Sequence, residues 1–278
     1  MKIMTVDMDK PAVSIVEEPA GWAGWWGRGL IARILLDEVD PACEPLGPGN
    51  VFILTRGPLA GTGITSASRT SAGGKSPLTG GVKEANAGGN FGEYLGRLGL
   101  KAIIARGQAP RSQFYILEVS SRGDGRLEAA DDIRDLGVYD MADVLRQRYG
   151  ANTALALNGP SGTGLMNLAG VMCTDREGVP NRAAARGGLG TVMASRGLKA
   201  VVLASPEVKT PIADEDGFAG ARLRLNQAAL EHVKTNSSMQ TVGTAGMVST
   251  TQHLGALPTR NFTSGQFELA DNIKGATV

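Results

Sequence analysis

The feature that most constrains the fold of this chain is an internal repetition of its glycine-rich segments. Three segments of the first half recur in the second half, in the same order and about a hundred residues later. One such match arises easily by chance, but an ordered series of matches does not. We therefore infer two copies of one unit, each presenting a glycine loop. The recurring segments are GPLAGTG at 57–63 and GPSGTG at 159–164, the Gly-Gly pairs at 88–89 and 187–188, and GLKAII at 99–104 and GLKAVV at 197–202.

Composition places the chain among globular proteins and removes several classes of function. Hydrophobic residues make up 42% and charged residues 20% of its 278 residues, enough for a sizeable core. The net charge of +1 gives no argument for nucleic acid or a membrane as a partner. No apolar run approaches the roughly 18 residues that span a bilayer, and the acidic N-terminal segment is unlike a secretion signal. We expect a cytoplasmic protein.

The cysteines and histidines are too few for several kinds of site. Cys43 and Cys173 are the only cysteines, and they lie far apart in unrelated contexts. This excludes a disulfide framework and any cysteine-ligated cluster held by this chain alone, so we predict two structural buried thiols. The two histidines, His232 and His253, argue against a histidine-rich metal site.

Hydrophobic periodicity predicts a mixed α/β chain that changes texture near 206–211, where helices take over. The segments 62–76, 159–164 and 174–186 are interpreted as loops. The predicted strands are 1–6, 12–18, 51–55, 101–105, 114–119, 126–129, 153–157, 165–173 and 198–204, and the predicted helices are 28–39, 92–98, 139–149, 191–196, 213–234 and 243–253.

The glycine pairs indicate a phosphate-binding chemistry. A Gly-Gly pair that enters a helix exposes backbone N–H groups at the positive end of the helix dipole, which suits a phosphate. Cations stand upstream of both pairs, Arg69 and Lys75 before the first and Arg182 and Arg186 before the second. The ligand would carry two phosphates, or come as two related molecules about a pseudo-twofold axis. The alternative is that these glycines serve tight turns or helix–strand packing.

Familiar nucleotide and hydrolase motifs do not fit the chain. Residues 73–76 have the ending of a P-loop, but Arg69 stands where that motif requires its first glycine. The Gly-x-Gly-x-x-Gly fingerprint after a strand is absent. Two histidines late in the chain make no credible Ser-His-Asp set.

Several blocks of the sequence resemble one family. The hexapeptide KSPLTG, the segment ANAGGNFGEYLGRLGLKAII and the segment NRAAARGGLGTVMASRGLKAVV are similar to the N-terminal half of tungsten-containing aldehyde:ferredoxin oxidoreductases. The resemblance runs from about Gly27 to Asn272, and the combination of KSPLTG with RGG-x-G-x-V-M is highly specific to that family.

The resemblance implies an α+β fold. Residues 1–208 would form an internally duplicated, two-lobed α+β cofactor-binding domain, a pseudo-twofold pair of β-sheets with short helices. Its repeat units would cover about 1–105 and 106–208. Residues 209–278 would form a helical segment, the start of an all-α domain that is completed elsewhere.

The resemblance also implies a tungsten bis-pterin cofactor (tungstopterin), or its molybdenum form. A magnesium ion would join the two pterin phosphates through the backbone carbonyls of Asn86 and Ala183, and Arg69 would bridge a pterin and a 4Fe–4S cluster. Ala185 departs from the glycine that relatives commonly have there. The candidate cofactor-binding residues are Arg69, Lys75, Asn86, Ala87, Gly88, Gly89, Arg182, Ala183, Ala185, Arg186, Gly187 and Gly188.

The family's cluster cysteines and its catalytic acid and histidine lie in helical domains beyond Val278, so no residue here is assigned a catalytic role. The expectation is an N-terminal part of an enzyme that oxidises an aldehyde to its acid and passes electrons through the cluster to ferredoxin. A C-terminal region or a partner subunit would supply the cluster, and a homo-oligomer is also open. The alternatives are a non-catalytic carrier of the pterin cofactor, or a protein for another bis-phosphate ligand.

Overall fold

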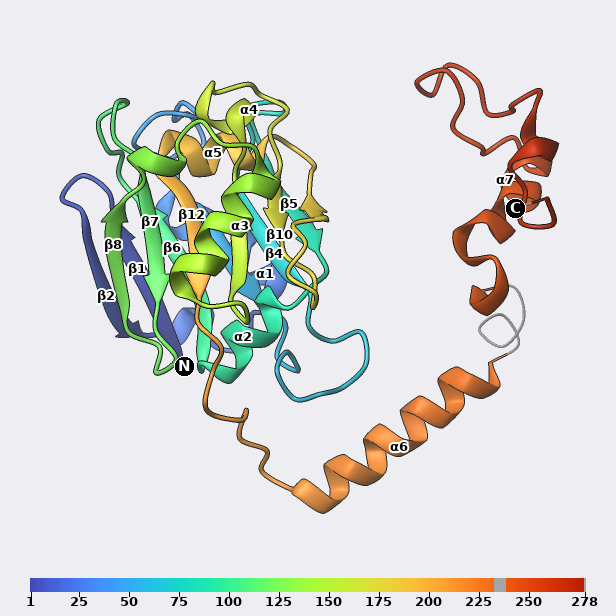
Figure 1. Cartoon of the computed structure of the whole chain (residues 1–278), viewed down its shortest axis with the longest axis horizontal. Coiled ribbons are helices and arrows are strands. Elements are labelled where there is room, and N and C mark those ends of the chain that lie inside the picture. Colours follow the sequence, from blue (N-terminus) through green and yellow to red (C-terminus); the bar gives the residue numbers. More distant parts are fainter. Residues whose placement is uncertain (233–238, 278) are drawn as a thin grey trace. The chain divides into compact units, whose positions relative to one another are not determined.

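The computed structural model describes residues 1–232 and 239–277 and divides the chain into two compact units (Figure 1). Unit 1 is Met1–Pro211 and contains both sheets; unit 2 is Ile212–Val278 and is helical. Within the described ranges, no helix combines the length and apolar character that a membrane span requires.

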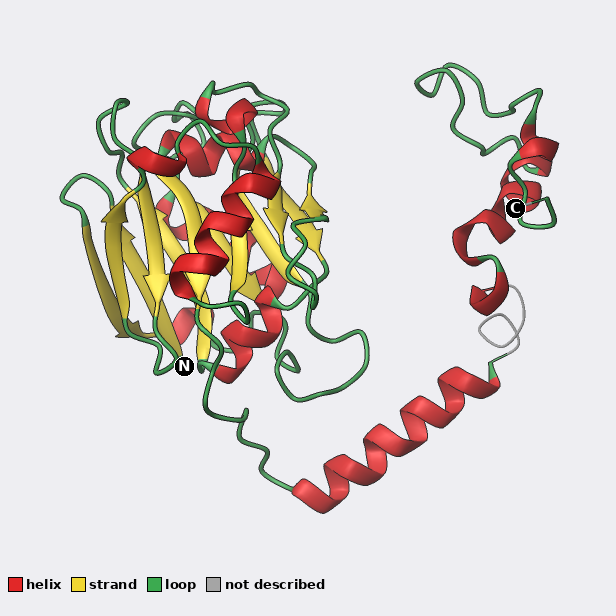
Figure 2. Cartoon of the chain, viewed as in Figure 1, coloured by secondary structure: helices red, strands yellow, loops and turns green. Residues whose placement is uncertain are grey.

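Twelve strands form two sheets in unit 1 (Figure 2). The strands are β1 (Lys2–Asp7), β2 (Ala12–Glu17), β3 (Phe52–Arg56), β4 (Thr70–Lys75), β5 (Val82–Ala87), β6 (Leu100–Arg106), β7 (Tyr115–Val119), β8 (Gly125–Ala129), β9 (Ala154–Leu157), β10 (Val171–Cys173), β11 (Arg182–Ala184) and β12 (Leu198–Leu203). The first sheet has the order β2-β1-β6-β3-β4-β5, and the second has the order β8-β7-β12-β9-β10-β11.

The two sheets repeat one topology. β1 runs parallel to β6 in the first sheet, β7 runs parallel to β12 in the second, and the other neighbours are antiparallel. The connection from the second to the third strand carries a helix in both halves, and so does the connection from the fifth to the sixth. This correspondence supports the duplication inferred from the sequence.

One helix covers the outer face of each sheet, and the main core lies between the two sheets. The helices of unit 1 are α1 (Gly27–Glu38), α2 (Phe91–Arg97), α3 (Val138–Tyr149), α4 (Pro160–Thr163) and α5 (Leu189–Ser195). Side chains alternate between the two faces of β6, with Ile103 in the central core and Ile104 in the core beneath α1. A further core lies between α3 and the second sheet. α2 and α5 contribute to the central core.

Arg196 ties the repeats together. The side chain is fully buried, and its guanidinium donates hydrogen bonds to the carbonyls of Asn50 at 2.8 Å and Leu46 at 3.2 Å, both in the first repeat. Burial lowers the pKa of Arg196 to about 10. Carbonyl oxygens around a buried cation compensate for lost hydration, so this residue acts as a strut between the lobes.

The segment 62–76, expected as a loop, contains β4, so that expectation is wrong for 70–75. β4 reads TSAGGK and has no large apolar side chain, which hides it from a periodicity search, yet all six residues are buried. The small residues allow α1 to lie close to the strand. A Cβ at Gly73 would lie 2.4 Å from Cγ2 of Ile31.

Three shorter predictions in the second repeat are also corrected. The strand expected at 165–173 is confined to β10, and Leu165, with a φ of 51°, cannot lie in a strand. The expected loop 174–186 contains β11, and the expected loop 159–164 contains α4. β10 and β11 pair only over three residues, too few for a periodic signal.

Unit 2 contains α6 (Glu215–Glu231) and α7 (Val248–His253). Asp214 caps α6 by accepting a hydrogen bond from the backbone N–H of Gly217 at 2.9 Å. No residue of α6 is buried. Residues 233 and 234 of the predicted helix 213–234 lie outside the described residues. The predicted helix 243–253 is a 3-10 turn followed by α7.

Candidate functional site

The two repeats jointly line one cavity of about 560 Å³. It lies where edge strand β5 of the first sheet meets edge strand β11 of the second. Six of the candidate residues line it, four from the first repeat and two from the second. They are Arg69, Asn86, Gly88, Gly89, Arg182 and Ala183.

The glycine pair after β5 forms one wall and must be glycine at its second position. Gly89 has a φ of 94°, and a Cβ there would lie 2.1 Å from the carbonyl oxygen of Thr174. Gly88 is less constrained, because its nearest neighbour would be Cδ of Arg182 at 3.9 Å. Beside this wall, the hydroxyl of Ser71 donates to Oδ1 of Asn86 at 2.6 Å. The wall therefore exposes backbone to the cavity with little side chain in the way.

The opposite wall is the turn between β10 and β11, which is organised by Asp175. The carboxylate accepts hydrogen bonds from the backbone N–H of Val179 at 2.9 Å and from the side chain of Asn181 at 2.6 Å. Burial opposes ionisation of Asp175, but these hydrogen bonds and the charge of Arg182 prevail and hold its pKa below the usual range. The carboxylate thus serves the turn as an internal acceptor.

The charges around the cavity leave two arginines available. Arg176 forms an ion pair with Glu93 at 3.2 Å, across the repeats. Arg69 and Arg182 are exposed, and neither forms an ion pair with an acid in the part of the chain that the structure describes. Guanidiniums beside exposed backbone are the groups that suit an anion with phosphate-like oxygens.

Lys75 is not brought to this cavity. It lies on β4, is buried, and its ammonium donates to the backbone carbonyls of Pro41 and Cys43, both at 2.5 Å. Lys75 thus lies outside the lining of this cavity, and its contact with a phosphate stays a prediction. β4 directs the side chain of Lys75 towards these carbonyls. The spacing of Lys75 from the glycine pair in the sequence does not reveal this placement.

The second glycine pair packs on the first repeat. Gly187 has a φ of 79°, and its carbonyl accepts a hydrogen bond from the hydroxyl of Ser76 at 2.8 Å. Gly188 has a φ of 69°, and a Cβ there would lie 2.1 Å from the carbonyl oxygen of Asn167. Together with exposed Ala185 and Arg186, this loop lies outside the lining of the 560 Å³ cavity. Ala87 also lies outside it, since its methyl group belongs to the central core.

Two family models match the chain, one within each unit. The model for the N-terminal domain of aldehyde ferredoxin oxidoreductase matches residues 3–205. The chain belongs to the aldehyde ferredoxin oxidoreductase family. A second model, for domains 2 and 3 of the same family, matches residues 222–278. Unit 1 is thus the family's N-terminal domain, and unit 2 carries sequence of the domains that follow.

Curated relatives agree with this assignment. The chain is 34% identical over 283 residues to the tungsten-containing aldehyde ferredoxin oxidoreductase of Thermococcus kodakarensis. This match covers all of this chain and 45% of the relative. It is 34% identical over 259 residues to the protein of the same name from Pyrococcus furiosus, covering 91% of this chain and 41% of the relative. The chain therefore spans less than half the length of these relatives.

A solved structure shows the same fold. It is the active site complex BamBC of benzoyl coenzyme A reductase in complex with 1,5-dienoyl-CoA, with a TM-score of 0.75 and 26% identity. The match covers 82% of this chain and 34% of that chain. The two six-stranded mixed sheets with short helices are thus a fold that this chain shares with that structure.

The residues of the cavity fit the anionic end of the family's cofactor. Its phosphates require cations and backbone donors, and Arg69, Arg182 and the Gly88–Gly89 turn supply both kinds of group. Asn86 and Ala183 line the same cavity. Among residues 1–232 and 239–277, no cluster of three or more His, Cys, Asp or Glu side chains is arranged to hold a metal.

Sequence reasoning missed four lining residues, all in the turn between β10 and β11. A signal for this turn exists in the sequence, since Asp175 followed by Gly178 is typical of a side-chain-stabilised turn. This signal predicts a turn, but it does not predict that the turn lines a cavity. The cavity arises from the contact between edge strands β5 and β11, which is a tertiary feature. The missed residues are Asp175, Arg176, Glu177 and Asn181.

Proposed function

We propose that the chain is the tungstopterin-binding N-terminal part of an aldehyde ferredoxin oxidoreductase. The observation that carries this proposal is the convergence of Arg69 and Arg182, one from each repeat, on a single cavity beside Gly88 and Gly89. A ligand with two phosphate groups matches a site built from two copies of one unit. The similarity to tungsten-containing relatives supports the identity of that ligand.

Six residues of the cavity have a role in this proposal. Arg69 and Arg182 neutralise phosphate oxygens, and the Gly88–Gly89 turn allows them to approach the backbone. Asn86 and Ala183 offer their backbone carbonyls to magnesium, an ion that prefers oxygen ligands. Arg69 would also help to hold a 4Fe–4S cluster that the rest of the enzyme supplies. When bound, the cofactor supplies the two-electron oxidation of an aldehyde to a carboxylic acid.

The complete enzyme requires more protein than unit 1 and unit 2 contain. The lengths of the relatives support this part of the proposal, because the matches cover only 45% and 41% of the two relatives named above. The remainder of domains 2 and 3, on the same chain or on a partner subunit, provides the cluster. Ferredoxin is the proposed electron acceptor and the cytoplasm the proposed location.

The proposal is tested by the metal content of variants. A tagged chain is purified, with whatever protein accompanies it, from its own host grown with tungstate. Arg69→Ala and Arg182→Ala should each lower tungsten plus molybdenum per chain. Each lost charge-assisted contact weakens binding about tenfold. Arg122→Ala, an exposed arginine in the turn after β7, is the control and should keep the wild-type content. Unchanged metal in both cavity variants would contradict the proposal.

A further inference from the structure

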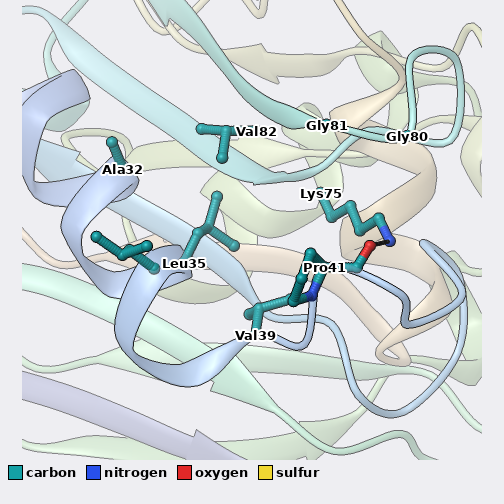
Figure 3. Close-up of a pocket in the computed structure, with 9 residues that line it drawn as sticks. Ala32, Leu35, Val39, Pro41, Lys75, Gly80, Gly81 and Val82 are labelled. Atoms are coloured by element: carbon teal, nitrogen blue, oxygen red, sulfur yellow. Dashed lines mark hydrogen bonds between the residues drawn. The ribbon is translucent and has the colours of Figure 1, made fainter.

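A second cavity, of about 390 Å³, lies between α1 and the hairpin of β4 and β5 (Figure 3). Leu35, Leu36 and Val39 of α1 line one side, and Val82 and the glycines of the hairpin turn line the other. The volume lies within the range of small-molecule sites, about 300–1,000 Å³. It shares no lining residue with the cavity at the sheet edges.

The walls of this cavity are held in place by contacts within the protein. Ile31 packs directly on the backbone of Gly73, which fixes the distance between α1 and β4. The side chain of Asn50 clamps the end of β4, since its Nδ2 donates to the carbonyl of Lys75 at 2.9 Å and its Oδ1 accepts from the N–H of Lys75 at 3.0 Å. A preformed site spends little free energy on ordering when it binds.

The polar group of the cavity is Lys75, whose side chain reaches along the wall to Pro41 (Figure 3). The residue is only 8% exposed. Its ammonium has three N–H donors, of which two are used by the carbonyls of Pro41 and Cys43. In the described ranges of the chain, no acidic side chain forms an ion pair with it. A buried charge without a counter-charge is costly, so an anion in the cavity would be stabilised there.

We propose that this cavity binds a small amphipathic carboxylate, with the carboxylate at Lys75 and an aliphatic tail along α1. The apolar side chains from Ala32 to Val39 extend over two turns of the helix, about 10 Å, which sets the length of the tail. Leu36, which is 76% exposed, and Val82, which is 59% exposed, stand at the rim and gain a cover when the tail is bound. The unpaired cation distinguishes this ligand from a neutral hydrocarbon or an apolar protein side chain.

Calorimetric titration of the full chain with octanoate tests the proposal, with octan-1-ol as the uncharged comparison. Octanoate should bind, and octan-1-ol should bind about tenfold more weakly or not at all, since it loses a charge-assisted hydrogen bond. Val82→Trp fills the cavity from its exposed rim and should abolish binding. Val16→Trp, at a valine that is 44% exposed on edge strand β2, is the matched control and should bind as wild type.

Lys75→Met tests the carboxylate contact itself and should remove the preference for octanoate over octan-1-ol. If Lys75→Met does not fold, the comparison of octanoate binding by Val82→Trp and Val16→Trp tests the proposal. Absence of octanoate binding at millimolar concentration, or equal binding by Val82→Trp and wild type, would overturn the proposal. So would sedimentation that shows a dimer dissociated by Val82→Trp but not by Val16→Trp, since the groove would then be covered by a second copy.

Discussion

The hydroxyl of Thr174 donates a hydrogen bond to Oδ1 of Asn90 at 3.0 Å, in the buried layer directly behind the cavity at the sheet edges. The backbone N–H of Asn90 also donates to the carbonyl of Thr174 at 3.3 Å. Asn90 precedes α2 in the first repeat, and Thr174 follows β10 in the second. The two repeats are thus joined at the floor of the site, so its geometry depends on both of them.

Substitution of Gly89 should disturb this junction. In Gly89→Ala, the new methyl group meets the carbonyl of Thr174, and the φ of 94° is strained for alanine. We expect the free energy of unfolding to fall by about 2 kcal/mol or more. Gly88→Ala is the control, because its methyl group has space, and it should change stability by less than about 1 kcal/mol. Urea unfolding that gives equal losses for both variants would contradict the strain assigned to Gly89.

Asp175 should contribute stability that depends on pH. Its pKa is held below the usual range in the folded chain, so the stabilisation is full above the unfolded value of 3.8 and is lost as the pH falls through the folded pKa. Asp175→Asn cannot offer two acceptor oxygens to the turn and should cost about 1–2 kcal/mol near neutral pH. Unfolding curves of both proteins between neutral and acidic pH give the difference, which should shrink in acid. A difference independent of pH would refute this role.

Lys199 should have the opposite dependence. The side chain is fully buried, its ammonium donates to Oγ1 of Thr163 at 2.7 Å, and burial lowers its pKa to about 8 from 10.5. The folded chain therefore binds fewer protons than the unfolded chain between these two values, and stability rises with pH across that window. Relative to Lys199→Met, the wild type should gain about 1–3 kcal/mol from pH 8 to 10.5. Exposed Lys209→Met is the control and should show no such change.

The two thiols should differ in reactivity. Burial raises the pKa of Cys173 to about 12, so little thiolate forms at pH 8, whereas Cys43 is partly exposed. The native chain should react with one equivalent of a thiol reagent, at Cys43, and the unfolded chain with two. Cys43→Ser should leave the native chain unreactive. Rapid labelling of native Cys43→Ser would show that Cys173 is accessible.

The duplication was predictable because the glycine-rich segments of the first repeat recur in the same order in the second. GLKAII and GLKAVV become the equivalent strands β6 and β12, and the strand order of the two sheets agrees with that inference. The prediction that both cysteines are buried holds for Cys173, while Cys43 is only partly buried.

The predictions that differ from the structure concern residues whose positions depend on tertiary contacts. β4 escaped detection because its core contacts are made by backbone and small residues against Ile31. Lys75 was grouped with Arg69 since they are six positions apart, but β4 separates them, and the lysine ends among carbonyls beneath α1. The turn around Asp175 is part of the site only because β5 and β11, the edge strands of the two sheets, contact one another.

The central claim, that the joined repeats hold a tungsten or molybdenum pterin within a larger oxidoreductase, is tested most directly by purifying the tagged chain from its own host. The eluate is analysed for metals, and its proteins are identified by mass spectrometry. We expect tungsten or molybdenum together with about four irons per chain, in the presence of protein that carries a cysteine cluster motif. Chain that carries neither metal nor pterin, with or without a partner, would contradict it.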